Sequence, residues 1–464
     1  MELELKGLRK LFFSGIGGSG MSALAQVLAG RGFEISGSDR KHDRGESSGF
    51  FSRLEAQGIT LSAQDGSGVH RRLDAVVVSS AVEPDTPDYR RAVELGVRLI
   101  LRAELLTALV NSHRGFCFSG TSGKSTATAL CAYVLTELGL SPNFIGGAAP
   151  VNFLDRPTTG NALGGTSDIY CVESCESDGS IVAYRPAVGV ILNIERDHHE
   201  LEKLLPMFET FANAATERLV LNADCPNTAR LDLSNSRAKK ILFGIESPEA
   251  QLRAAGIELQ PMRASFTAGP LRLESPLPGM YNIYNVLAAL AACEAAGVAG
   301  EDFARLLPGF RGVVRRFQLA GEKRGVTVID DFAHNPAKIE AVLSAFDSWK
   351  ALRRRIVVFQ PHGYGPTRFY FDQLVDTFAA SLTGSDLLIL PEIYYAGGTA
   401  ARDISSRQVT EAVKSRGVNA VYFENRAEAV PLIAQEAGRG DVVLVLGARD
   451  DSLSDFCREV LEAL

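Results

Sequence analysis

A glycine-rich segment at residues 120–126 has the residue types of a phosphate-binding loop. Its members are Gly120, Thr121, Ser122, Gly123, Lys124, Ser125 and Thr126. An apolar run precedes it and a helix-forming run follows, so backbone N–H groups can cradle a phosphate at a helix N-terminus. Lys124 can reach phosphate oxygens and the Ser125 hydroxyl can bind Mg²⁺. Phe118 stands where the usual pattern has its first glycine, and a turn without a ligand is the alternative.

A second glycine-rich segment lies near the start of the chain and has the G-x-G-x-x-G spacing. Its members are Gly15, Gly17, Gly18, Ser19 and Gly20, and Asp39 follows the next strand-like run. The glycines allow backbone N–H groups to approach a diphosphate, and a carboxylate can accept hydrogen bonds from ribose hydroxyls. A dinucleotide and a UDP-sugar both carry these groups, so the spacing leaves both open, together with a turn that binds nothing.

Two polar segments follow other strand-like runs. Glu173 opens an acidic segment after the run 169–172, and His198 lies in an Asp-His-His segment after the run 188–192. Open α/β sheets bind ligands at the carboxyl ends of their strands, so both residues are candidates for holding a nucleotide-bound metal. A solvated acidic loop and a structural histidine are the alternatives.

The composition is that of a large globular protein that can position such loops. The chain has 464 residues, enough for about three domains, with 46% hydrophobic and 22% charged residues. The formal net charge of −7 supplies no basic surface, so we expect no nucleic-acid partner. The seven cysteines include no C-x-x-C pair, which favours a reduced compartment over a disulfide framework.

Short apolar runs alternate with helix-compatible stretches such as 201–215 and 286–296 along the chain. This alternation predicts an α/β fold with mostly parallel sheets, and we expect an antiparallel extension over 235–275. Candidate domains are 1–112, 113–312 and 313–464. No apolar run approaches the ~20 residues of a membrane-spanning helix and no export signal is visible, so we expect a cytoplasmic protein without membrane contact.

Nine motifs in a fixed order resemble those of the Mur ligases, cytoplasmic three-domain enzymes of bacterial peptidoglycan synthesis. They are GIGGSGMSALA, SGSD, GTSGKST, VESCESDGS, NIERDHHE, PLPGMYNIYNVLAALAA, VVRRFQ, DDFAHNP and FQPHGYGPTR. The resemblance implies Rossmann-like first and third domains and a central P-loop ATPase domain. It further implies an ATP- and Mg²⁺-dependent ligase that joins L-alanine to the lactyl carboxylate of UDP-N-acetylmuramate through an acyl phosphate.

The resemblance also implies roles for individual residues in binding. The 15–20 segment and Asp39 would bind the UDP-sugar rather than a dinucleotide. Lys124 and Ser125 would hold ATP and Mg²⁺, with Glu173 and His198 as further metal ligands.

Residues nearer the C-terminus complete the implied site. Asn282, Arg316 and Asp331 would contact ATP, although Asn282 is alternatively a helix cap. His334, His362 and Arg368 would face the reacting groups and, with Lys124 and His198, form the candidate catalytic set.

Four residues depart from the pattern of the Mur ligases that add L-alanine. These are Ser122, Cys175, Asn335 and Gly363, where those enzymes commonly have His, Asp, His and Arg. The acceptor is therefore open between L-alanine and a recycled peptide, and we expect a monomer or a weak homodimer. More remote alternatives are an NAD-dependent oxidoreductase and a nucleotide-binding regulator without catalytic activity.

Overall fold

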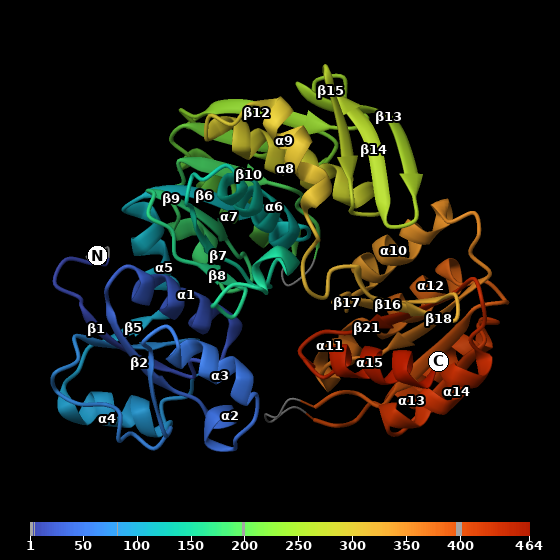
Figure 1. The fold of residues 1–464 in the computed structure, drawn as a ribbon, viewed down its shortest axis with the longest axis horizontal. Helices are drawn as coiled ribbons and strands as arrows, with labels where there is room; N and C mark the ends of the chain where they lie inside the picture. Colours follow the sequence, from blue (N-terminus) through green and yellow to red (C-terminus); the bar gives the residue numbers. More distant parts are fainter. Residues whose placement is uncertain (1–2, 4, 81, 197–199, 396–400) are drawn as a thin grey trace. The chain divides into compact units, whose positions relative to one another are not determined.

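The computed structural model describes residues 3, 5–80, 82–196, 200–395 and 401–464 of the chain (Figure 1). The described residues form three sheets with helices and divide into two compact units. The first unit comprises 1–257, 265–276 and 282–313, and the second comprises 258–264, 277–281 and 314–464. Mostly parallel strands in all three sheets confirm the predicted three-domain α/β fold class.

The first sheet has five parallel strands in the order β3-β2-β1-β4-β5. Its strands are β1 (Lys10–Ser14), β2 (Glu34–Ser38), β3 (Thr60–Ser62), β4 (Ala75–Val78) and β5 (Leu99–Leu101). Its helices are α1 (Ser19–Gly30), α2 (Arg40–Asp43), α3 (Ser48–Glu55), α4 (Pro87–Leu95) and α5 (Arg102–Asn111). The strand order reverses beside β1, which is the position where open parallel sheets bind ligands, and the 15–20 segment follows β1 there.

The second sheet has ten strands in the order β15-β14-β13-β12-β11-β10-β6-β9-β7-β8. Its strands are β6 (Arg114–Ser119), β7 (Asn143–Ile145), β8 (Ala162–Leu163), β9 (Ile169–Glu173), β10 (Val188–Ile191), β11 (Arg218–Asn222), β12 (Lys239–Gly244), β13 (Leu252–Gln260), β14 (Arg263–Ala268) and β15 (Leu271–Ser275). The associated helices are α6 (Lys124–Glu137), α7 (Leu201–Asn213), α8 (Met280–Ala295) and α9 (Gly300–Leu306). The predicted phosphate loop connects β6, in the middle of this sheet, to α6.

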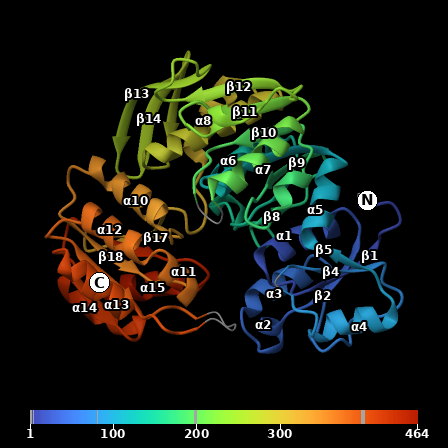
Figure 2. The same ribbon diagram turned by 180° about the vertical axis from the view of Figure 1, so that it is seen from behind.

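The expected antiparallel extension over 235–275 is wrong for its first strand. β12 pairs in parallel with both β11 and β13, because its backbone continues the parallel ladder of the sheet. β13 and β14 lie beyond β12 in the sheet order, and Figure 2 shows them from behind.

The third sheet has the order β16-β17-β21-β18-β19-β20 and is parallel except for β16. Its strands are β16 (Gln318–Lys323), β17 (Val326–Asp331), β18 (Arg354–Phe359), β19 (Leu387–Pro391), β20 (Ala420–Phe423) and β21 (Asp441–Leu446). Its helices are α10 (Pro336–Ser344), α11 (Tyr364–Phe369), α12 (Phe371–Ser381), α13 (Ser406–Ser415), α14 (Ala429–Glu436) and α15 (Leu453–Ala463). The inner strands β17, β18, β19 and β21 are mostly apolar and buried because helices cover both faces of the sheet, whereas the edge strand β16 is polar.

Strand β21 shows this two-sided burial. Val442, Leu444 and Leu446 pack with residues of α10, α12 and α13. Val443 and Val445, which point the other way, pack with residues of α14 and α15. The carboxyl ends of β17, β18 and β21 are thereby held by two separate apolar cores.

Two further observations concern the cysteines and the helices. All seven cysteines are free. Within the described parts of the chain, no helix has both the length and the apolar character needed to cross a membrane.

Gly363 adopts a backbone conformation that only glycine reaches easily. It precedes α11 with φ 81° and ψ 143°, and its N–H donates to the Tyr394 carbonyl oxygen at 2.9 Å. An added Cβ would meet nothing closer than Pro366 Cδ at 3.6 Å, so the restriction comes from the backbone rather than from space.

We therefore expect Gly363→Ala to lower the free energy of unfolding by about 1–3 kcal/mol. Gly365→Ala is the matched control, since a Cβ there has nothing within 4 Å and Gly365 lies inside α11. That control should be neutral or stabilising by up to about 1 kcal/mol. Urea unfolding followed by the fluorescence of Trp349, the single tryptophan, measures both, and equal effects would contradict the explanation.

Candidate active site

The phosphate loop is held by hydrogen bonds to Asn193, and Asn285 packs against it. Asn193 Oδ1 accepts hydrogen bonds from Thr121 Oγ1 at 2.7 Å and from Ser122 N at 2.8 Å. Gly123 has φ 84°, and an added Cβ would lie 2.2 Å from Asn285 Oδ1. The loop conformation therefore depends on glycine at 123 for both backbone and space.

Lys124 begins α6 and forms an ion pair with Glu176, with 14% of the Lys124 side chain and 2% of the Glu176 side chain exposed. Its Nζ donates to Glu176 Oε2 at 2.9 Å and to the Gly120 carbonyl oxygen at 2.5 Å. Burial is the largest influence on the pKa of Lys124 and lowers it, but Glu176, Cys175 and Glu173 together outweigh that effect and raise the pKa above its usual value. These neighbours, with Glu176 in direct contact, thus favour the cationic form of Lys124.

Ser125 and Glu173 provide adjacent oxygen atoms beside the loop. Ser125 Oγ donates to Glu173 Oε2 at 3.0 Å, and Glu173 Oε1 accepts from Gly147 N at 2.6 Å. A hydroxyl and a carboxylate are ligands that Mg²⁺ prefers. His198, the third predicted metal ligand, lies outside the described residues. Among those that are described, no three His, Cys, Asp or Glu side chains gather into a ready metal site.

Asn282 lies in the first turn of α8 and is buried. Its Oδ1 accepts a hydrogen bond from Asn285 Nδ2 at 2.9 Å. The helix begins at Met280, so Asn282 is inside it rather than in the preceding capping position. Asn285, its hydrogen-bond partner, packs directly against Gly123 of the phosphate loop.

The first glycine-rich segment is anchored by Asp39. Asp39 Oδ2 accepts from Gly17 N at 2.8 Å and Oδ1 accepts from Lys41 N at 2.9 Å, so the carboxylate also caps α2. The Ser38 carbonyl oxygen accepts from both Gly15 N and the next backbone N–H, each at 2.9 Å. The structure therefore brings the predicted glycine residues and Asp39 together at the start of α1.

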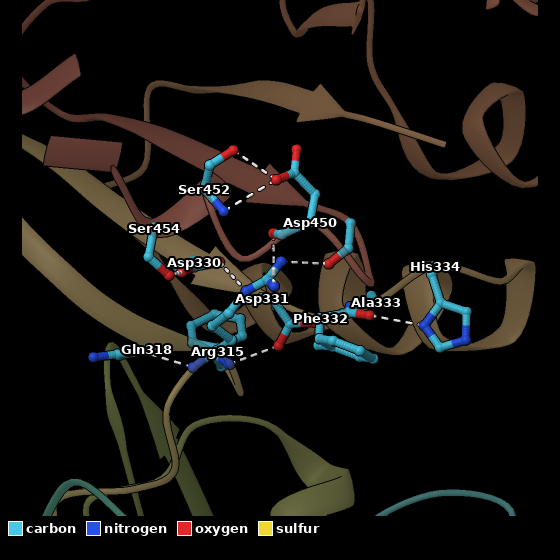
Figure 3. A network of polar contacts seen from close by, with 12 residues as sticks. Arg315, Gln318, Asp330, Asp331, Phe332, Ala333, His334, Asp450, Ser452 and Ser454 are labelled. Carbon is cyan, nitrogen blue, oxygen red and sulfur yellow. Dashed lines mark hydrogen bonds and ion pairs between the residues drawn. The ribbon is translucent and has the colours of Figure 1, made fainter. Parts of the chain in front are cut away.

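In the second unit, Arg315 joins the segment before β16 to the carboxyl ends of β17 and β21 (Figure 3). Its guanidinium is buried and ion-pairs Asp330 at 3.3 Å. It also donates to the carbonyl oxygens of Asp450 at 3.0 Å and Gly447 at 2.6 Å. Arg315 and Phe317 both have positive φ, 58° and 47°, so these contacts hold a strained backbone.

Asp331 lies at the end of β17 and fixes the same segment. Its Oδ2 accepts from Phe317 N at 2.6 Å and its Oδ1 accepts from Ala333 N at 2.7 Å. Burial raises the pKa of Asp331 to about 6, partly offset by the Arg316 charge and by the two backbone donors. The Arg316 guanidinium lies 4.6 Å from the centre of the Phe332 ring, so Arg316 and Asp331 are close.

The predicted histidines meet on the second unit, and Arg368 lies in α11, which begins two residues after His362. The rings of His334 and His362 are 5.0 Å apart between centroids, edge to face. The Nδ1 atom of His334 is 2.9 Å from the Phe332 carbonyl oxygen. Arg368 in α11 forms an ion pair with Asp403.

Four residues that contact the candidate site were missed by the sequence interpretation: Glu176, Asn193, Asn285 and Arg315. All four stand in motifs that were singled out, and Arg315 precedes the predicted Arg316. For Glu176 and Asn193 the position after a strand end was an available signal, but nothing local shows that Glu176 meets Lys124, 52 residues away.

Two of the four departures have local structural roles. Asn335 caps α10, where its Oδ1 accepts from Lys338 N at 3.0 Å, a role that Asn fills well. Gly363 occupies the positive-φ turn before α11. Cys175 Sγ lies 2.9 Å from Ser177 Oγ, and Ser122 contributes its backbone to the Asn193 contact. Nothing in the structure explains the side chains of Cys175 and Ser122.

Family models cover most of the chain. Residues 10–114 match the Mur ligase family catalytic domain, 118–293 the Mur ligase middle domain, and 315–449 the Mur ligase glutamate ligase domain.

Full-length relatives carry one name. The UDP-N-acetylmuramate–L-alanine ligase of Streptomyces avermitilis is 35% identical over 453 residues, covering 94% of each chain. The enzyme of the same name from Thermobifida fusca is 34% identical over 482 residues, covering 100% of this chain and 98% of the relative.

Solved structures show the same fold. The UDP-N-acetylmuramate-alanine ligase of Thermotoga maritima has a TM-score of 0.78 at 24% identity, covering 98% of both chains. A murein peptide ligase from Psychrobacter arcticus has a TM-score of 0.68 at 20% identity, also covering 98% of both chains.

The buried Arg315 contacts predict a large stability effect. Arg315→Met should lower the free energy of unfolding by about 3–5 kcal/mol, because it leaves Asp330 buried without its cation. The control is Arg416→Ala, which removes an exposed ion pair with Asp376 and should change stability by less than about 1 kcal/mol. Denaturant unfolding followed by Trp349 fluorescence gives both values. Similar small losses would show that the Arg315 network contributes little.

Proposed function

The chain belongs to the Mur ligase family, and from this premise we propose that it joins L-alanine to the lactyl carboxylate of UDP-N-acetylmuramate with hydrolysis of ATP to ADP and phosphate. The resemblance seen in the motifs is confirmed by the three Mur ligase family models, which match residues 10–114, 118–293 and 315–449. Full-length relatives named UDP-N-acetylmuramate–L-alanine ligase favour L-alanine as the acceptor. They favour it over the recycled-peptide, oxidoreductase and regulator alternatives.

The observation that carries the proposal is the charged lysine inside the phosphate loop. Amide formation from a carboxylate in water needs an activated leaving group, and transfer of the γ-phosphoryl group from ATP supplies one. The transferring oxygens carry negative charge that a fixed cation stabilises. The negative groups around Lys124, led by Glu176, together raise its pKa despite its burial, so a cation lies beside the phosphate loop before ATP binds.

The residues beside the loop fit a divalent cation. The Ser125 hydroxyl and the Glu173 carboxylate are 3.0 Å apart and carry the oxygen ligands that Mg²⁺ prefers. We assign them, with His198, to hold that ion. When bound, Mg²⁺ supplies further neutralisation of phosphate charge.

The reaction then needs an acyl phosphate and an amine. The lactyl carboxylate attacks the γ-phosphorus of ATP and ADP leaves. The L-alanine amine next attacks the acyl carbon, loses a proton and expels inorganic phosphate. His334, His362 and Arg368 are assigned to the acceptor and the acyl phosphate, and Asn282, Arg316 and Asp331 to ATP. The 15–20 segment and Asp39 are assigned to the UDP-sugar.

The departures at Asn335 and Gly363 agree with an alanine acceptor as well as with a peptide. Asn335 is used in capping α10 and Gly363 in a turn, so both residue types have reasons unrelated to the acceptor. Neither residue therefore requires an acceptor other than L-alanine.

A direct assay tests the proposed activity. The purified chain with UDP-N-acetylmuramate, ATP and Mg²⁺ should release phosphate when L-alanine is added, and mass spectrometry should find the UDP-N-acetylmuramoyl-L-alanine product. Glycine, L-serine and an L-alanyl-γ-D-glutamyl peptide serve as comparison acceptors. Product from the peptide with none from L-alanine would overturn the assignment in favour of peptide recycling.

Replacing Lys124 tests the role of the phosphate loop. Lys124→Ala should lower the rate of phosphate release by about 10²–10³-fold, because a preorganised charge at the transferring group is lost. Lys240→Ala is the control, since Lys240 is exposed on β12 of the same unit and should keep the wild-type rate. Near-wild-type release by the Lys124 variant would remove the loop from the mechanism.

A further inference from the structure

Arg102 places a cation beside the first glycine-rich segment, and none of the assigned residues includes it. It is the first residue of α5, directly after β5, so it lies at the same carboxyl edge of the first sheet as the 15–20 segment. A Cβ added at Gly20 would lie 3.4 Å from both Cδ and Nη1 of Arg102 and 3.5 Å from its Nε. The guanidinium therefore lies along the first turn of α1.

The other end of the same guanidinium is held by the acidic segment after β9. Arg102 Nη2 donates to Asp178 Oδ2 at 3.0 Å, and both side chains are about three-quarters buried, with 24% and 26% exposed. Asp178 Oδ1 in turn accepts from Ser180 N at 3.0 Å, which fixes the carboxylate. Asp178 thus takes one nitrogen of Arg102 and leaves Nη1 and Nε on the side of Gly20.

The acidic segment that holds Arg102 also contacts the ATP loop. Within six residues, Glu173 accepts from Ser125, Glu176 pairs with Lys124, and Asp178 pairs with Arg102. One short segment therefore positions groups at both phosphate loops of the first unit.

We propose that Arg102 binds the diphosphate of the UDP-sugar and that Asp178 is the positioning residue that orients it; this rests on the proposed function. Arginine offers a planar set of donors suited to phosphate oxygens, and the helix N-terminus beside it favours the same anion. Asp178 prevents the long side chain from turning away, so less conformational freedom is lost when the diphosphate binds.

Calorimetry with UDP and with UDP-N-acetylmuramate tests the proposal. Arg102→Ala should weaken both ligands by about 10- to 100-fold, the range for losing charge-assisted hydrogen bonds. The affinities of Arg102→Lys should lie between those of Arg102→Ala and wild type, because lysine keeps the positive charge but lacks the planar set of guanidinium donors. ATP binding should stay unchanged. The control is Arg91→Ala, which removes an exposed arginine of α4 in the same sheet region and should leave all affinities unchanged.

The role of Asp178 is tested by a double-mutant comparison. Asp178→Ala should weaken UDP about 3- to 10-fold in the wild-type background and have no effect in the Arg102→Ala background. An equal loss in both backgrounds would show that Asp178 acts independently of Arg102 and would overturn its positioning role.

Three outcomes separate the claims. Arg102→Ala affinities within twofold of wild type would overturn the diphosphate assignment, as would a loss confined to UDP-N-acetylmuramate. Failure of the wild-type chain to bind either UDP compound would instead overturn the proposed function on which this inference rests.

Discussion

A largely buried positive charge is the constraint around which the first unit is arranged. Lys124 has 14% of its side chain exposed, and burial by itself lowers the pKa of an ammonium group. Glu176 and its neighbours more than offset this effect, and Glu176 does so from the segment that follows β9 of the second sheet. Any change that moves that segment therefore changes both the position and the pKa of Lys124.

The same acidic segment explains why the neighbouring contacts are so dense. Glu173 engages Ser125 and Gly147, while Asp178 engages Arg102 from the first sheet. Asn193 and Asn285 complete the enclosure of the loop from two further elements. The loop is short and rich in glycine, so its conformation is set by these partners rather than by its own side chains.

In the second unit, buried contacts at the carboxyl ends of β17 and β21 hold a strained backbone and a buried carboxylate. Arg316, one of the unit's assigned residues, lies between Arg315 and Phe317, whose φ angles are both positive. Buried contacts from Arg315 stabilise that backbone, and the carboxylate of Asp331, the other assigned residue, accepts the Phe317 N–H as well as the N–H of Ala333. The raised pKa of Asp331 is the consequence of placing a carboxylate where burial outweighs its donors. Strain and an unfavourable charge are thus concentrated at the assigned ATP contacts.

The sequence by itself determined the features that depend on neighbours along the chain. The strand, glycine loop and helix at 10–30 and 114–137, the apolar strands of the third sheet and the helix within 201–213 were all predictable from residue type and periodicity. The domain boundaries and the roles of the site residues stay predictions. Only the tertiary structure decided which partners meet: Lys124 with Glu176 across 52 residues, and Arg315 with Gly447 across 132. It also reversed the expected strand direction at β12, because the direction of a strand depends on the ladder it joins and not on its own residues.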